Sequence, residues 1–233
     1  MTNPSVSYGD VRVEAMNEFL RGVYRWMAAG LILTAVTAQV VASSESLIYA
    51  IFGSRMLFIG LIVAELGLVM YLSHAIGRIR SATAMGLFVL YSLLNGVTLS
   101  GILLVYTGES VASAFLTTAG MFGAMSVYGL YTKRDLTSLG SFLIMGLWGL
   151  IIASVVNMFI GSGTGGMVIS VMGVLIFLGL TAWDTQRLRD LGGQVDVEGD
   201  EMGRKLVIIG ALHLYLDFVN MFLYMLRLFG KRR

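Results

Sequence analysis

Seven long apolar stretches, separated by short polar joints, account for almost the whole chain. Each has close to the length of about 20 residues that a helix needs to cross a bilayer. The only proline, Pro4, lies outside all of them, so no stretch contains a helix-breaking proline. The pattern therefore predicts seven transmembrane helices, at about residues 23–42, 56–73, 82–106, 111–131, 138–160, 166–188 and 206–229.

The composition is that of an integral membrane protein and leaves no room for a soluble domain. Hydrophobic residues make up 57% of the 233 positions and charged residues 13%, and the formal net charge is only +2. Such a chain is not expected to bind nucleic acid, and without cysteine it has no thiolate metal ligands. We expect an all-α polytopic membrane protein with an amino-terminal arm (1–22), a seven-helix transmembrane domain (23–230) and a basic tail (231–233).

Lysine and arginine in the short joints predict the orientation in the membrane. Eleven lie in the arm, at the start of the first segment and in the second, fourth and sixth joints, whereas the alternate joints hold only Arg55. This bias places the amino terminus in the cytoplasm. The tail is an exception, since a seventh crossing carries it to the far side; alternatively, the seventh segment does not fully cross. The eleven residues are Arg12, Arg21, Arg25, Arg78, Arg80, Lys133, Arg134, Arg187, Arg189, Arg204 and Lys205.

Small residues four positions apart predict where helices approach one another closely. Three such pairs lie inside the apolar segments, at Gly60/Ala64, Gly96/Ser100 and Gly120/Ala124. Together they indicate a compact helical bundle.

Three carboxylates interrupt the apolar segments: Glu65, Asp184 and Asp217. A charge at the centre of a spanning helix costs roughly 2.5–3.5 kcal/mol, so such residues usually face the bundle interior or water and serve a function. Asp217 lies about 11 residues into the last segment, roughly 16 Å along a helix and close to mid-depth. If the sixth helix continues through Leu191, with no breaker before Gly192, Asp184 lies about 10 Å from its end.

The two aspartates can then meet across neighbouring helices. Two carboxylates in contact at low dielectric cannot both ionise cheaply, so they share a proton and form a proton sensor. The same pair is a hard-oxygen site in which calcium can replace the proton. Alternatively, each aspartate is a structural hydrogen-bonding residue packed against Tyr215, Asn220 or Gln186, and spacing alone does not decide between these interpretations.

Other polar residues are candidates for supporting roles. Glu65 is either a second cation ligand in a pore or a partner for a neighbouring helix. Arg78 and Arg80 are candidates for a latch that pairs with the aspartates in a closed state, although such arginines more often only set orientation. His213 lies four residues before Asp217 on the same helical face, where it either tunes the pair or forms an ordinary hydrogen bond.

Two motifs are not expected to form ligand sites. The joint DVEGDE (196–201) resembles a calcium loop, but the required glycine and closing glutamate are replaced by Glu201 and Val207. It is interpreted as a solvated acidic loop. The run SGTGG (162–166) follows no predicted strand and therefore indicates a tight turn rather than a phosphate loop.

The segments GLTAWDTQ (179–186) and GALHLYLDFVNMFLYMLRLFG (210–230) resemble the sixth and seventh segments of the Bax inhibitor-1 family, also called the transmembrane Bax inhibitor motif family. The resemblance extends in order over the whole chain, through YRWMAAGL (24–31), IVAELGL (62–68) and YTKRDLTSLG (131–140), which match bacterial members. It implies six helices around a central seventh, an aspartate pair at Asp184 and Asp217, and a pH-sensitive calcium leak. One departure is His213, where relatives carry a small polar residue.

The resemblance therefore predicts a calcium or cation leak channel of a bacterial inner membrane, controlled by Asp184 and Asp217. No cofactor is expected beyond calcium as a permeant or bound ion, and the partners are the lipid bilayer and calcium or protons. Bacterial relatives are also linked to restraint of a membrane-bound protease. The alternative is therefore a non-conducting modulator that binds a membrane protease or another membrane complex.

An enzymatic function is not expected. Aspartates in adjacent sixth and seventh helices are also the arrangement of intramembrane aspartyl proteases. Those enzymes carry a Gly-x-Gly-Asp motif, whereas Asp217 follows Leu214, Tyr215 and Leu216.

Overall fold

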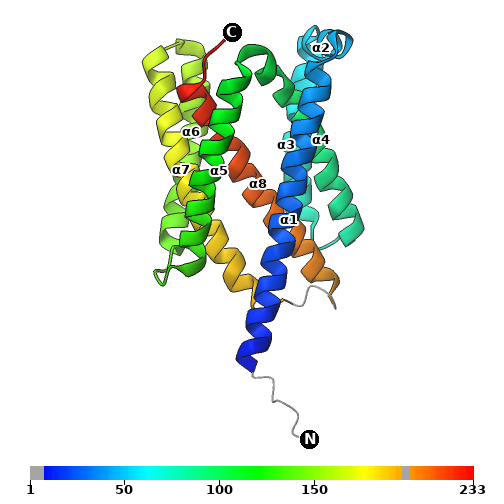
Figure 1. The fold of residues 1–233 in the computed structure, drawn as a ribbon, viewed down its shortest axis with the longest axis vertical. Coiled ribbons are helices and arrows are strands. Elements are labelled where there is room, and N and C mark those ends of the chain that lie inside the picture. The colour runs from blue at the N-terminus through cyan, green and yellow to red at the C-terminus, as the bar shows by residue number, and fades with distance from the viewer. Residues whose placement is uncertain (1–7, 196–199) are drawn as a thin grey trace, which may run out of the picture. The chain divides into compact units, whose positions relative to one another are not determined.

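The computed structural model describes residues 8–195 and 200–233, and within these ranges the chain is all-α (Figure 1). Seven of its helices are long and apolar enough to cross a membrane, as the hydrophobic pattern predicts. The additional short helix is α2. The elements are α1 (Tyr8–Ala42), α2 (Glu45–Phe52), α3 (Arg55–Ala75), α4 (Ser81–Val105), α5 (Gly108–Tyr131), α6 (Thr137–Ile160), α7 (Gly163–Gly192) and α8 (Glu201–Phe229).

The amino-terminal helix differs from the prediction because it begins at Tyr8 rather than near residue 23. Phe19 and Leu20 in the arm are buried, and Phe19 continues with Val23 and Met27 of the first segment at a helical spacing of four, which forms one buried apolar face. The described part of the arm is therefore an amphipathic extension of the first spanning helix. The predicted acidic loop lies mostly outside the described residues, which omit 196–199.

The chain forms two compact units. Unit 1 comprises Met1–Gly101 and Arg187–Leu212, and unit 2 comprises Ile102–Gln186 and His213–Arg233. Helices α7 and α8 contribute to both units and are the most buried: 56% and 61% of their apolar windows are buried, against 11% in α3 and in α6. The high burial of α8 is what a central seventh transmembrane helix requires.

Close packing in unit 1 involves α1 and α4. A Cβ atom on Gly96 would lie 2.6 Å from Thr37 Cβ and 2.7 Å from the Thr34 carbonyl oxygen. The Thr34 hydroxyl in turn donates to the Ser92 carbonyl at 2.9 Å. The predicted close approach at Gly96 is thus confirmed.

The same prediction is wrong for Gly60 and Gly120, where an added Cβ would have no described neighbour within 4 Å. Both glycines lie on outward faces, since Ala64 and Ala124 of the same pairs are exposed. A small-residue spacing permits close approach but does not require it.

Unit 2 is held together by aromatic contacts between α5 and α8. The ring of Phe218 makes edge-to-face contacts with Phe115 and Phe122, at centroid distances of 5.3 and 5.5 Å. On α7, Phe177 stacks with Tyr224 of α8 at 6.1 Å. Such contacts fix α5 and α7 against the part of α8 that carries Asp217.

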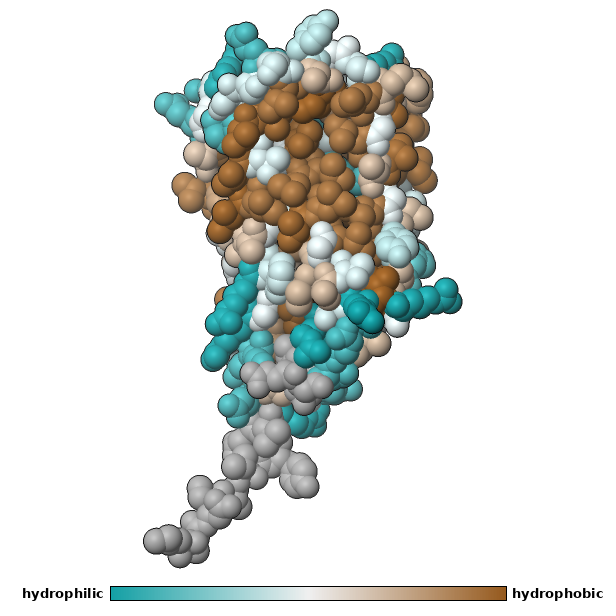
Figure 2. Space-filling model, turned by 90° about the vertical axis from the view of Figure 1, so that its right-hand side faces the viewer, coloured by the Kyte–Doolittle hydropathy of each residue, from teal (hydrophilic) through white to brown (hydrophobic). Residues whose placement is uncertain are grey.

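Large apolar side chains are exposed along several helices, as expected for contact with lipid. On the face shown in Figure 2 they form one broad hydrophobic area, with hydrophilic residues bordering it. A soluble monomer rarely exposes so large an apolar surface, which fits acyl chains instead. Exposed apolar side chains from the described chain as a whole include Val63, Leu66 and Met70 on α3, and Met145, Trp148 and Ile152 on α6.

The joint between α6 and α7 is a tight turn at Gly161 and Ser162, whereas the rest of the run SGTGG, predicted to form the turn, is the first turn of α7. Gly161 ends α6 with φ of 71°, a left-handed conformation that glycine adopts without a Cβ clash. Its N–H donates to the Asn157 carbonyl at 2.8 Å, and α7 begins at Gly163.

The basic tail is fixed to the joint between α4 and α5. Thr107 N–H donates to the Lys231 carbonyl at 3.1 Å, and Arg233 N–H donates to the Val105 carbonyl at 2.9 Å. Four long helices, α5 to α8, connect this joint to the tail, and an even number of crossings returns the chain to the same side. If α8 did not cross, the tail would lie on the opposite side of the membrane from this joint. The hydrogen bonds between the tail and the joint therefore favour a full crossing by α8.

We expect fusions of topology reporters to place the two termini on opposite sides of the membrane. The amino terminus should report as cytoplasmic, because of the positively charged joints, and the carboxyl terminus as external. Paired alkaline phosphatase and fluorescent protein fusions measure this directly. Two termini on the same side would contradict the crossing by α8 and the depth of Asp217.

Candidate functional site

The structure brings Asp184 of α7 and Asp217 of α8 together in unit 2. Both side chains are buried, with whole-residue exposures of 8% and 4%. The Asp217 carboxyl group forms a side-chain hydrogen bond with that of Asp184. A hydrogen bond between two carboxyl groups needs a proton on one of them, so this contact has the geometry that proton sharing requires.

The continuity of α7 accounts for the position of Asp184. This helix runs without a break to Gly192, as the absence of a breaker before that residue predicts. Helix α5 approaches it closely at Gly129, where a Cβ would overlap the Ala182 carbonyl and lie 3.0 Å from Thr185 Cβ. Gly129 thus allows the backbone of α5 to approach that of α7 closely at Ala182 and Thr185, which lie on either side of Asp184 in the sequence.

Apolar residues surround Asp217 along α8. Tyr215, Phe218 and Met221 are buried, and the ring of Phe218 is covered by two phenylalanines of α5. In such a low-dielectric setting, interactions between charged or polar groups are stronger than in water. The pair is therefore placed where gain or loss of one proton has a large electrostatic effect.

Several buried polar atoms of unit 2 have no hydrogen-bond partner within the described part of the chain. Asp217 Oδ2 is one of them, and the hydroxyls of Thr118, Ser126 and Thr185 are the others. Thr118 and Ser126 share the buried face of α5 with Phe122 between them. An unpaired buried polar atom costs about 1–3 kcal/mol, so these oxygens are available to water, a proton or a cation.

The other residues predicted from the sequence take different positions. His213 is half-buried in unit 2, one turn before Asp217. Glu65 belongs to unit 1, where it accepts hydrogen bonds from Asn95 Nδ2 at 3.2 Å and Thr98 Oγ1 at 2.8 Å. It therefore pairs with the neighbouring helix α4. Arg78 and Arg80 are exposed in the joint between α3 and α4, also in unit 1.

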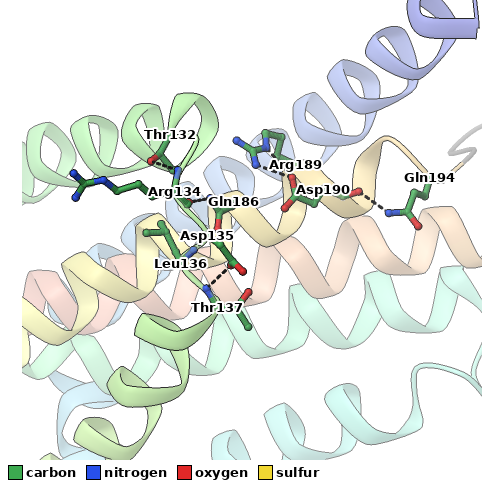
Figure 3. A network of polar contacts seen from close by, with 9 residues as sticks. All are labelled: Thr132, Arg134, Asp135, Leu136, Thr137, Gln186, Arg189, Asp190 and Gln194. Atoms are coloured by element: carbon green, nitrogen blue, oxygen red, sulfur yellow. Dashed lines mark hydrogen bonds and ion pairs between the residues drawn. The ribbon is translucent and has the colours of Figure 1, made fainter.

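Gln186 has a structural role that the sequence did not indicate (Figure 3). Its buried amide accepts a hydrogen bond from Leu136 N–H at 2.8 Å and donates one to the Arg134 carbonyl at 2.7 Å. It thereby fastens the joint between α5 and α6 to α7, two residues after Asp184. The alternative in which Gln186 or Asn220 binds an aspartate is not supported, since Asn220 Nδ2 donates to the Leu216 carbonyl of its own helix at 2.8 Å.

Asp135 stabilises the start of α6 within the same joint. Its Oδ1 atom accepts a hydrogen bond from Thr137 N–H at 2.8 Å, and hydrogen bonds from the Thr137 side chain and backbone hold the pKa of Asp135 below its ordinary value. A depressed folded-state pKa contributes stability above the unfolded-state pKa. That contribution is lost as the pH falls through the folded-state pKa.

We expect Gln186→Leu to lower the free energy of unfolding by about 1–3 kcal/mol, because it leaves a buried N–H and a carbonyl without partners. Thermal unfolding of the detergent-solubilised protein measures the change. Gln194→Leu is the matched control, since the exposed Gln194 side chain makes one hydrogen bond among the described residues, to the Asp190 carbonyl; it should change stability by less than about 0.5 kcal/mol. Equal losses in both variants would contradict the role given to Gln186.

Residues 16–233 match the family model described as inhibitor of apoptosis-promoting Bax1. The chain belongs to the Bax inhibitor-1 family. The inner membrane protein YbhL of Escherichia coli strain K12 is 47% identical over 218 residues, which cover 94% of this chain and 93% of that protein. An uncharacterized protein of Borreliella burgdorferi is 46% identical over 217 residues, covering 93% of each chain. The resemblance seen in the helical segments is thus confirmed, and seven apolar helices agree with a membrane protein of this family.

Proposed function

We propose that this member of the Bax inhibitor-1 family is a pH-sensitive leak channel for calcium or another cation, controlled by Asp184 and Asp217. The hydrogen-bonded contact between these two buried carboxyl groups supports the proposal most directly. We place the protein in a bacterial inner membrane with its amino terminus in the cytoplasm. The name of the Escherichia coli relative and the charge bias of the joints favour this location.

Protons and divalent cations compete for the same carboxylate oxygens. When the pair loses its shared proton, two negative charges face each other at low dielectric, and a calcium ion between them removes the repulsion. Calcium binding should therefore weaken as the pH falls, because protonation of the ligands opposes it.

The pair is too small to hold calcium tightly. Within the described residues there is no cluster of three or more acidic or histidine side chains suited to a metal ion, whereas calcium usually takes six to eight oxygen ligands. The remaining ligands would be water and the unpartnered hydroxyls of Thr118, Ser126 and Thr185. Conduction requires binding weak enough for release, which an incomplete ligand set provides.

The supporting residues enter the proposal in secondary roles. His213, one turn from Asp217, would tune the pair through its own charge. The latch role of Arg78 and Arg80 and the cation-ligand role of Glu65 stay predictions from the sequence, and the hydrogen bonds of Glu65 to α4 favour its packing role. Substitution of each by a neutral residue of similar size, followed by flux measurement, separates these roles from simple effects on orientation and packing.

Cation flux into liposomes that contain only the purified protein tests the proposed function. Calcium entry should depend on the protein and should change across a pH series. Flux that appears only when a membrane protease or another membrane complex is added would favour the non-conducting modulator instead. Absence of flux at every pH would overturn the leak.

We also infer that the aspartate pair has no catalytic role in this chain, because the Gly-x-Gly-Asp context is missing before Asp217. The purified protein should leave transmembrane peptide substrates intact over long incubation. Electrophoresis with mass spectrometry of the products measures this. Cleavage that both Asp184→Ala and Asp217→Ala abolish would establish an aspartyl protease instead.

A further inference from the structure

A cavity of about 750 Å³ opens in unit 2 beside the turn between α6 and α7. Its charged lining residues are Arg227, close to the end of α8, and Arg232 in the tail, and no described carboxylate lines it. Ser154, Asn157 and Ser162 add uncharged polar groups. Neither arginine forms an ion pair with another described residue, so the cavity has two uncompensated positive charges.

Arg227 lies against the first turn of α7. Its Nη2 atom is 3.0 Å from the position that a Cβ atom would take on Gly166, so the absence of a side chain there admits the guanidinium. The amino-terminal end of a helix has a partial positive charge, which repels a cation. An arginine held in this position therefore adds to an electropositive surface.

Backbone hydrogen bonds fix the position of Arg232. Lys231 N–H donates to Ser110 Oγ at 2.9 Å, and Arg233 N–H donates to the Val105 carbonyl at 2.9 Å. The residues on both sides of Arg232 are thus tied to the end of α4 and the start of α5. A cationic group on a fixed backbone loses less conformational entropy when it binds an anion.

We propose that this cavity binds a phosphate group through Arg227 and Arg232. Planar guanidinium groups match phosphate oxygens with two parallel hydrogen bonds, and the Ser162 hydroxyl and Asn157 amide can donate to the remaining oxygens. The run SGTGG contributes the Ser162 hydroxyl, and its remaining residues begin α7. The charged binding groups come from the last helix and the tail, far from this run in the sequence.

The surroundings of the cavity favour the phosphate of an anionic lipid over free phosphate. Met158 and Met167 line the same cavity and are 72% and 64% exposed, and the neighbouring Phe159 and Ile160 at the end of α6 are also exposed. Apolar residues beside a basic pocket accommodate acyl chains next to a headgroup. Phosphatidylglycerol has this combination of chemistry.

Native mass spectrometry of the full-length protein in detergent tests the site with phosphatidylglycerol and phosphatidylcholine as probes. Phosphatidylglycerol should bind in preference, and Arg227→Gln and Arg232→Gln should each weaken its binding by about tenfold through loss of a charge-assisted contact. Arg233→Gln is the matched control, because Arg233 is an adjacent tail arginine outside the cavity lining; its binding should equal that of the wild type. Arg227→Lys keeps the positive charge but lacks the planar guanidinium group, so it should lose less affinity for phosphatidylglycerol than Arg227→Gln.

Inorganic phosphate forms the second arm of the experiment. Tight phosphatidylglycerol binding that millimolar inorganic phosphate does not displace identifies a lipid headgroup site. Binding of inorganic phosphate alone, reduced by the same two substitutions, identifies a site for free phosphate and still supports the assignment of Arg227 and Arg232. Equal affinity for both lipids with no phosphate binding, or an equal loss in Arg233→Gln, would overturn the proposal.

Discussion

Replacement of either aspartate of the pair by asparagine should abolish most of the pH dependence of cation flux. Asparagine has nearly the same shape as aspartate but does not titrate, so Asp184→Asn and Asp217→Asn should each remove the proposed exchange of a proton for a cation. Because the proposal makes the two residues one titrating unit, the double variant should add little to either single variant. Flux into liposomes over a pH series, measured with a calcium-sensitive dye inside, gives all three responses.

Asp190→Asn provides the control for these variants. Asp190 lies on the same helix but is exposed and paired with Arg189 at 2.8 Å, so its replacement should leave the pH profile of flux unchanged. Independent, additive shifts from the two buried aspartates would show that they titrate separately. If the pH profile of flux is unchanged in both single variants, Asp217 is a structural hydrogen-bonding residue and not part of a proton sensor.

Gly129→Ala should destabilise the protein, although alanine favours helix formation by up to about 1 kcal/mol over glycine. The new Cβ would overlap the Ala182 carbonyl, a backbone atom that cannot rotate away. Overpacking of this kind usually costs about 1–3 kcal/mol, which exceeds the gain in propensity. Thermal unfolding in detergent should therefore show a lower midpoint, and flux should lose its pH dependence if α5 is displaced from α7.

Two glycines on the same helix serve as controls with the opposite expected sign. Gly120 and Gly123 have no described atom within 4 Å of an added Cβ, so Gly120→Ala and Gly123→Ala should be neutral or stabilising. A similar loss of stability in all three variants would mean that α5 tolerates no alanine for reasons other than contact with α7.

The spanning helices could be predicted from the sequence because a bilayer imposes a length and an apolar composition on each of them. The early start of α1 was missed because the buried apolar residues of the arm, such as Phe19 and Leu20, are few among polar ones. Helix α2 was missed because it is too short to leave a clear periodic pattern. The approach of α5 to α7 at Gly129 was not among the predicted glycine contacts, since spacing marks a permissible contact and not its partner.

The aspartate pair of the candidate site could also be predicted from the sequence, but the long-range contacts around it could not. Helical rise gives the depth of Asp184 and Asp217 along their own helices, and that was enough to bring them together. The contacts of Gln186 span about 50 positions in the sequence, and no local rule connects an amide on α7 to a joint between two other helices. Arg232 reaches its cavity only because the tail is hydrogen-bonded to the joint between α4 and α5, a long-range contact that charge counting cannot reveal.

Release of protons on addition of calcium to the purified protein tests most directly whether the pair exchanges a proton for a cation. In weakly buffered detergent solution near neutral pH, calcium should release about one proton for each ion bound, because binding requires deprotonated carboxylates. Asp217→Asn should lose this release, while Asp190→Asn should retain it. Calcium binding without proton release, or equal release from Asp217→Asn and the wild type, would contradict control by Asp184 and Asp217.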